Sequence, residues 1–190
     1  MTRYSILAAV LVATGVAPAQ GQQAPSAPPA KDGAEVAPRG QHAARDIKYG
    51  DWRKLCFQAA GTKVLCRTTI TGRFDTGQTA IRVDLIERED GNARLQLFLP
   101  VGMYLQAGVK LSVDQNESVR LPYTWCLTNM CIAADGADRK LLQDMDGGKT
   151  LSVAVVDTNI LTVTTSVSLD HFASVRKGAA AQTFDQAIDE

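Results

Sequence analysis

The sequence predicts an all-β domain, mainly antiparallel, built as a β-sandwich or a barrel-like fold with one or two short helices and two local disulfides. Two observations lead to the fold class. Strand-length segments with alternating apolar and polar residues follow one another after Ile47, and turn residues separate them. A period of two gives each strand one buried and one hydrated face, which is typical of antiparallel sheets. Closely spaced strands of this kind favour a sandwich or a barrel.

The first segment, residues 1–19, is predicted to be a secretory signal peptide. Arg3 supplies a positive start, an apolar run follows from Ser5 to Ala17, and the small residues Ala17 and Ala19 form the cleavage pattern. Cleavage after Ala19 is favoured because cleavage after Ala17 would leave a proline first. The alternative, a membrane anchor, needs roughly 20 apolar residues, and this run is shorter. No later segment is apolar and long enough to cross a membrane.

Residues 20–46 are rich in alanine, proline, glutamine and glycine and show no periodic apolar face. Such a segment buries too little apolar surface to offset the entropy of ordering, so we expect a disordered spacer. The folded domain is expected at 47–178. Its roughly 130 residues are enough for one hydrophobic core. A flexible tail is expected at 179–190.

The domain contains seven to nine alternating segments, of which six are listed next. Their apolar positions are Ile81, Val83 and Leu85; Leu95, Leu97 and Leu99; Val109, Leu111 and Val113; Val119, Leu121, Tyr123 and Trp125; Leu151, Val153 and Val155; and Leu161, Val163, Val167 and Leu169. Arg82 and Asp84 fall on the opposite, hydrated face of their strand. The pair Asp90-Gly91 favours a hairpin turn. Pro122 implies a sheet edge or a bulge at its position.

Two segments favour short helices. Residues 136–148 have Asp138 near the start and a Gly-Gly pair to end the helix. Residues 169–178 have Asp170 as the expected N-cap, and Gly178 ends the segment.

All four cysteines lie in the part that would be exported: Cys56, Cys66, Cys126 and Cys131. An even number of cysteines in an exported chain indicates disulfides. Three pairings are possible, and the local pairing, Cys56–Cys66 with Cys126–Cys131, is favoured. Because small loops remove little entropy from the unfolded chain, each bond would stabilise the fold by about 2–3 kcal/mol at most.

A metal or redox role for the cysteines is the alternative. Zinc sites usually use tight C-x2-C pairs, and neither histidine, His42 or His171, lies near either cysteine pair. A thioredoxin-like site needs C-x-x-C at the start of a helix, whereas Cys126 and Cys131 enclose four residues. The sequence therefore predicts structural disulfides and neither a metal nor a cofactor.

No catalytic motif is complete. The G-x-S-x-G motif of serine hydrolases is absent, and a catalytic triad would depend on His171. The GGKT sequence at 147–150 lacks the first glycine of a phosphate-binding loop, because Gln143 occupies that position. The DMDGG sequence at 144–148 lacks the later ligands of a calcium loop. We therefore predict no enzymatic activity.

Charged residues give no further site. Asp84, Glu87, Glu89 and Asp90 lie close together in the sequence, and a solvated strand end is the expected explanation. The chain has 20 basic and 20 acidic residues, so it has no net basic charge that would favour nucleic acid or anionic lipid.

Trp52 and Trp125 are the weak candidates for a binding site. Each precedes a cysteine in the sequence, and a tryptophan beside a disulfide usually fills the core, because indole buries a large apolar area. The alternative is a ligand platform, with a groove near Trp125.

Four stretches, in this order, carry a family likeness: YGDWRKLC at 49–56, LFLPVGMYLQAGVKLSVD at 97–114, LPYTWCLTNMC at 121–131 and SLDHFASV at 168–175. Together they resemble the invasion-associated locus B family of bacterial envelope proteins. The likeness extends over 47–176. Family members often have Leu-x-Gly-Phe before the last helix, where this chain has His171, so we expect a local difference in that turn.

The resemblance implies an exported, mostly β domain of a bacterium, with two local disulfides and an envelope or secreted location. It supplies no catalytic residues. The expected function is a non-enzymatic interaction module, periplasmic or secreted and associated with the outer envelope. Its partner would be an unknown envelope or host protein, with a link to host-cell association or invasion. The alternative is a periplasmic protein that binds a small ligand or an envelope polymer.

Overall fold

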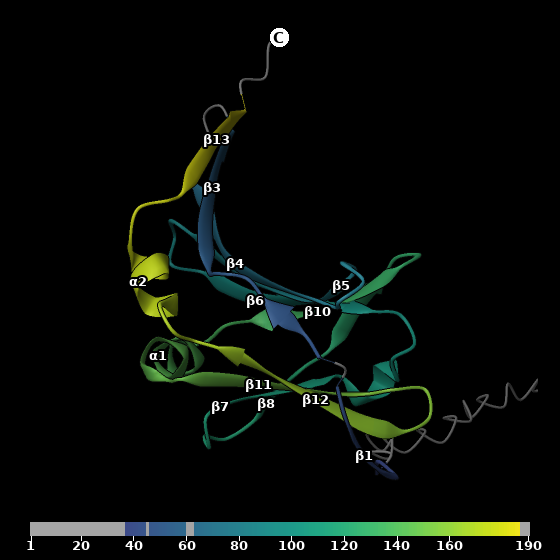
Figure 1. Cartoon of the computed structure of the whole chain (residues 1–190). Helices are drawn as coiled ribbons and strands as arrows, with labels where there is room; N and C mark the ends of the chain where they lie inside the picture. Colours follow the sequence, from purple (N-terminus) through teal and green to yellow (C-terminus); the bar gives the residue numbers. More distant parts are fainter. Residues whose placement is uncertain (1–36, 45, 60–62, 187–190) are drawn as a thin grey trace, which may run out of the picture. The chain divides into compact units, whose positions relative to one another are not determined.

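The computed structural model describes residues 37–44, 46–59 and 63–186, which form two sheets (Figure 1). The smaller sheet has five strands. In spatial order these are β1 (Gly40–Ala43), β12 (Leu161–Ser168), β11 (Thr150–Val156), β7 (Val109–Val113) and β8 (Val119–Leu121). All neighbouring strands are antiparallel except β1 and β12, which are parallel.

The larger sheet has eight strands. In spatial order these are β13 (Gln182–Gln186), β3 (Arg53–Ala59), β4 (Leu65–Arg73), β5 (Thr79–Arg88), β6 (Ala93–Pro100), β10 (Met130–Gly136) and β9 (Tyr123–Cys126), while β2 (Lys48–Tyr49) pairs separately with β4. Only β13 and β3 pair in parallel. Both sheets have end strands, so the fold is sandwich-like and not a closed barrel, which agrees with the predicted class.

The core lies between the two sheets. Alternate residues of β5 and β6 from the larger sheet, among them Val83 and Leu97, are fully buried. Leu111 of β7, together with Leu151 and Val153 of β11, buries the facing side of the smaller sheet. The alternation of apolar and polar residues therefore predicted the inward-facing residues of these strands correctly.

Two α-helices and one 3-10 turn complete the unit. Helix α1 (Arg139–Gly147) begins as predicted, because the Asp138 carboxylate accepts a hydrogen bond from the backbone N–H of Leu141 at 2.7 Å. Helix α2 (Phe172–Lys177) follows β12, and the 3-10 turn covers Leu105–Ala107. Among the described residues, neither helix has the length and apolar composition that a bilayer crossing requires.

The N-cap of α2 differs from the prediction. His171, not Asp170, is the N-cap, and its side chain makes no capping hydrogen bond. The backbone of His171 has φ +64°, in the left-handed region. Glycine, which the family resemblance leads us to expect at this position, adopts that conformation without steric cost.

Replacing His171 by glycine is therefore expected to stabilise the protein. Relief of the left-handed backbone should exceed the extra entropy of glycine in the unfolded chain, for a net gain of roughly 0.5–1 kcal/mol. Urea unfolding followed by circular dichroism measures the change. The matched control, Asp170→Gly, has no positive φ to relieve and should lower the stability. A destabilised His171→Gly protein would contradict this account.

The chain changes sheets at Pro122. The segment 119–125, predicted to be one strand with one apolar face, is instead β8 in the smaller sheet and β9 in the larger one. Pro122 does mark an edge, because β8 and β9 are both end strands. The prediction of one continuous buried face was wrong, because a register irregularity in the pairing of β9 with β10 places Tyr123 and Trp125 on opposite faces.

Two strands lie in segments that the sequence assigned to disorder. β1 falls within the expected spacer 20–46, and β13 falls within the expected flexible tail 179–190. Each pairs in parallel with a strand of the core domain, β12 and β3 respectively. These two segments are therefore strands because a neighbouring strand pairs with them, and not because they have an apolar pattern of their own. The predicted signal peptide, 1–19, lies outside the described residues.

Both local disulfides are present. Cys56 of β3 is bonded to Cys66 of β4, and Cys126 of β9 is bonded to Cys131 of β10. In each case the two residues are direct partners in the strand register, so each bond fixes the register of one antiparallel pair.

Candidate functional site

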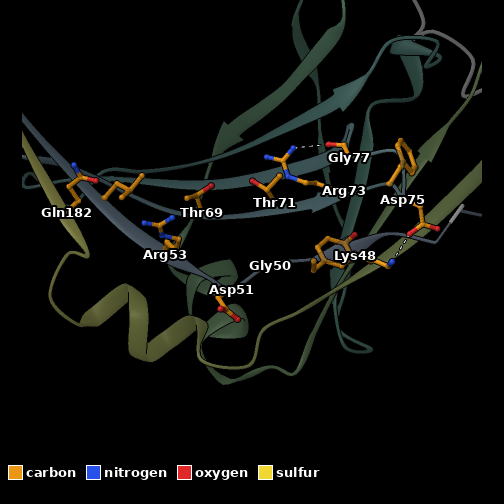
Figure 2. Close-up of a pocket in the computed structure, with 13 residues that line it drawn as sticks. Lys48, Gly50, Asp51, Arg53, Thr69, Thr71, Arg73, Asp75, Gly77 and Gln182 are labelled. Carbon is orange, nitrogen blue, oxygen red and sulfur yellow. Dashed lines mark hydrogen bonds and ion pairs between the residues drawn. The ribbon is translucent and has the colours of Figure 1, made fainter.

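The larger sheet has one face directed away from the smaller sheet, called the outer face below. Figure 1 shows β3 and β13 rising out of the layer of β4, β5 and β6 on this side, so the sheet curls over its outer face. A cleft of about 750 Å³, the outer cleft, opens there. Residues of β2, β3, β4 and β13 and of the turn after β4 line it (Figure 2).

The outer cleft contains both charges and hydroxyl groups. At one end Lys48 forms an ion pair with Asp75 at 2.8 Å. Arg73 donates hydrogen bonds to the Gly77 carbonyl at 3.0 Å and the Thr79 hydroxyl at 3.4 Å, both of them neutral acceptors. Arg53 has no ion-pair partner in the described part of the chain. The cleft therefore has cationic donors that are free to meet a ligand.

One side of the cleft reaches the interior through Tyr49. Its hydroxyl lies 2.7 Å from the Thr165 hydroxyl of the smaller sheet. Burial raises the pKa of the Tyr49 phenol, and the hydrogen bond to Thr165 opposes that shift. A Cβ on Gly72 would lie 2.7 Å from the Tyr49 ring and 2.6 Å from Ile47, so glycine at position 72 makes room for this packing.

Next to the cleft lies a buried carboxylate. Asp84 is 1% exposed and accepts a hydrogen bond of 2.5 Å from the hydroxyl of Thr69, which also lines the cleft. Two guanidinium groups flank it, with Arg82 at 3.2 Å and Arg67 at 3.8 Å. The prediction of a solvated carboxylate was wrong for Asp84, because these arginine side chains cover it.

Aromatic rings extend this arrangement across the outer face. The Arg82 guanidinium carbon lies 3.6 Å from the centre of the Phe98 ring, and that of Arg67 lies 5.5 Å from the centre of Phe57. Phe57 also stacks on Phe184 of β13, with ring centres 5.1 Å apart. The stack between β3 and β13 depends on the strand that the sequence assigned to the tail.

The outer cleft is equipped for binding. Among its lining residues are arginine, lysine and threonine donors and aspartate acceptors. Neither cysteine nor histidine is among the described residues that line it. Among the residues that the structure describes, no group of three or more histidine, cysteine or acidic side chains is placed to hold a metal ion.

A second cavity, of about 240 Å³, lies between the sheets and is lined mainly by apolar side chains. Ile81 and Leu99 line it from the larger sheet and Val153 from the smaller sheet. His42 and Asp157, whose Nε2 and Oδ2 atoms are 3.8 Å apart, also line it. The backbone N–H of Leu161 holds the pKa of the Asp157 carboxyl below its usual value.

The residues that the sequence singled out do not meet in one site. Trp52 is 6% exposed, and its indole N–H donates to the Ser168 carbonyl at 2.8 Å. Its ring contacts Phe172 edge to face, with centres 4.8 Å apart. Trp52 is thus a core residue and offers no ligand platform. His171 caps α2, and the four cysteines form the two disulfides.

Trp125 differs from the prediction that it fills the core. It is 66% exposed, while its neighbour Cys126 is bonded to the buried Cys131. A register irregularity between Ile132 and Ala133 gives Tyr123 and Trp125 opposite faces, so Tyr123 packs on the core and the indole of Trp125 faces outward. In the strand register, Trp125 is opposite Ile132, which is opposite Phe98. Trp125 therefore belongs to the outer face.

The cleft residues were not identified from the sequence. Arg53, Thr69, Thr71 and Gln182 come from three strands, and a single sequence does not show that β13 lies beside β3. One signal was available. The outward positions of the alternating segments repeatedly contain arginine, as at Arg82.

Comparisons with known proteins agree on one family. The model of the invasion associated locus B (IalB) protein family matches residues 52–180. The Invasion protein B homologs of two strains of Brucella abortus, 2308 and biovar 1 strain 9-941, are each 26% identical to this chain over 105 residues, or 55% of the chain. The match spans 61% of the length of these relatives.

A solved structure shows the same fold. The crystal structure of invasion associated protein b from Bartonella henselae superposes with a TM-score of 0.61 at 20% identity. The superposition covers 68% of this chain and 90% of that chain. Since the family model matches well over half of the sequence, the chain belongs to the invasion associated locus B (IalB) protein family.

Proposed function

We propose that this chain is an exported envelope protein that acts as a non-enzymatic interaction module. It binds its partner through the outer face of the larger sheet. One observation carries the proposal: this face displays arginine and aromatic side chains at the surface, including Arg53, Trp125 and Phe184. Tryptophan, tyrosine and arginine are the residues that most often dominate binding energy at protein interfaces.

Export supports the same function. Two disulfides suit an oxidising compartment, and the predicted signal peptide at 1–19 would deliver the chain there. We propose a periplasmic or secreted location for the folded domain. The family is named for invasion and not for a reaction, so a role in host-cell association is part of the proposal. Finding Gln20 at the N-terminus of the protein from culture fractions would support export.

Co-sedimentation with the envelope fraction of the source bacterium tests the binding face. The double variant Arg53→Glu/Arg94→Glu reverses two exposed charges on the outer face. The control, Lys110→Glu/Arg139→Glu, makes the same change at exposed positions of β7 and α1. We expect the first variant to lose co-sedimentation by about tenfold or more and the control to retain it. Equal binding by both variants, or no binding by the unmodified protein, would refute the proposal.

A second candidate function is small-ligand binding, and the apolar cavity of about 240 Å³ favours it. This volume exceeds the about 150 Å³ apolar cavity that holds benzene in an engineered protein. Displacement of the fluorescent probe N-phenyl-1-naphthylamine by octanol would measure binding. Val163→Phe, which places a larger side chain at the cavity wall, should abolish the signal. A signal unchanged in this variant would remove the cavity as the site.

A further inference from the structure

We propose that the ligand of the outer face is an acidic polysaccharide whose carboxylates bind the arginines and whose sugar rings lie on the aromatic side chains. This inference rests on the proposed function, since it names the ligand class of the same face. Its basis is a local excess of positive charge in a chain whose charges balance at 20 basic and 20 acidic residues.

The excess follows from the strand pattern. The outward positions of β3, β4, β5 and β6 carry six basic residues: Arg53, Arg67, Arg73, Arg82, Arg88 and Arg94. The same outward positions in these four strands carry a single acidic residue, Asp84. One carboxylate cannot neutralise six guanidinium groups, so the outer face attracts anions.

Two of these arginines are held in place before any ligand binds. Arg82 lies against Phe98 and reaches Asp84 at 3.2 Å, and its side chain is 33% exposed. Arg67 lies over Phe57 and reaches the same carboxylate, and 29% of the Arg67 side chain is exposed. A guanidinium fixed in this way loses less entropy when it binds a carboxylate. Planar guanidinium groups also match carboxylate geometry with two parallel hydrogen bonds.

The aromatic residues supply flat apolar surfaces beside these charges. One row across the sheet contains Trp125, Ile132, Phe98 and Arg82, each opposite the next in the strand register. At the other side of the sheet, Phe57 and Phe184 form a stacked pair. A sugar ring has an apolar C–H face and a polar rim, so alternating aromatic and guanidinium groups complement it. The two aromatic groups lie on different strands, which suits a polymer better than a single sugar.

The outer cleft supplies polar groups that match the hydroxyls of a glycan. It contains Asp51 and Asp75, whose carboxylates can accept hydrogen bonds from sugar hydroxyls. Thr71 and Gln182 add neutral donors and acceptors. A polypeptide that binds by strand addition needs a free sheet edge, whereas these residues lie on a sheet face.

Hyaluronan oligosaccharides, which alternate carboxylate-bearing and neutral sugars, are the probe. Their carboxyl-reduced form is the matched neutral glycan, and single-stranded oligothymidylate represents the competing class, nucleic acid. Tryptophan fluorescence and isothermal titration follow binding to the full chain. We expect hyaluronan to bind, with affinity falling about tenfold or more in the carboxyl-reduced form. Affinity should also fall as sodium chloride is raised from about 50 to about 500 mM, because added salt screens the charges.

Variants locate the site. Arg53→Gln/Arg94→Gln should weaken hyaluronan binding at least as much as carboxyl reduction does, while Lys110→Gln/Arg139→Gln should not change it. Trp125→Phe should remove most of the fluorescence response. The inference is overturned if the neutral glycan binds equally well, if oligothymidylate binds more tightly, or if hyaluronan fails to bind. If hyaluronan does not bind but co-sedimentation with the envelope still requires Arg53 and Arg94, only the ligand class is wrong. If the protein does not co-sediment with the envelope, the proposed function itself is wrong.

Discussion

Replacing Phe172 by alanine is expected to lower the free energy of unfolding by about 4 kcal/mol. Phe172 is the first residue of α2, is fully buried and contacts Trp52 edge to face at 4.8 Å. The substitution would remove this aromatic contact and leave a cavity between α2 and the larger sheet, since the surrounding strands cannot collapse to fill it. Guanidinium unfolding monitored by circular dichroism measures the loss.

Phe184→Ala is the matched control for Phe172→Ala. Phe184 is also a phenylalanine in an aromatic pair, but it is 36% exposed and stacks on Phe57 at the end of the sheet. Its removal should cost only about 1 kcal/mol, because solvent already covers part of the ring. Equal losses for the two variants would show that the contact between Trp52 and Phe172 does not anchor α2.

Replacing Asp84 by alanine is expected to cost about 3 kcal/mol of stability. The carboxylate is buried, and its loss would leave Arg67 and Arg82 facing each other without an anion while the Thr69 hydroxyl loses its acceptor. Since about a third of each arginine side chain is exposed, water will offset part of the penalty, which keeps the estimate at the lower end for a broken buried pair.

Asp84→Asn separates the charge from the hydrogen bond. Asparagine still offers an oxygen to Thr69, so this variant should lose less than Asp84→Ala. Asp185→Ala removes an exposed carboxylate from β13 and should change the stability by less than about 0.5 kcal/mol. If Asp84→Ala were as stable as Asp185→Ala, the arginines would not depend on the buried carboxylate.

Much of the fold was predictable because its signals are local. Alternation in β5, β6, β7 and β11 identified the inward residues, since each of these strands lies within one sheet for its whole length. The disulfide pairing was predictable for a similar reason. Each bond joins neighbours in an antiparallel pair that are also close in the sequence.

The wrong predictions concern segments whose structure depends on residues that are distant in the sequence. Nothing in the composition of β1 or β13 indicates a strand, because each is ordered by a parallel neighbour far away in the sequence. The exposure of Trp125 depends on the irregular pairing of β9 with β10, which reverses the inward side between Tyr123 and Trp125. The outer cleft could not be assembled from the sequence because β2, β3, β4 and β13 meet only in the folded sheet.

The parallel pairing of β13 with β3 has a consequence for the order of folding. The larger sheet cannot be completed until the last described strand is available, so in an exported chain β3 remains an open sheet edge during most of translocation. The bond between Cys56 and Cys66 closes only a short loop and can form as soon as β3 and β4 have emerged. We therefore expect oxidation of this pair to precede the docking of β13. A chain that lacked its C-terminal residues would keep an exposed edge and would be prone to aggregate.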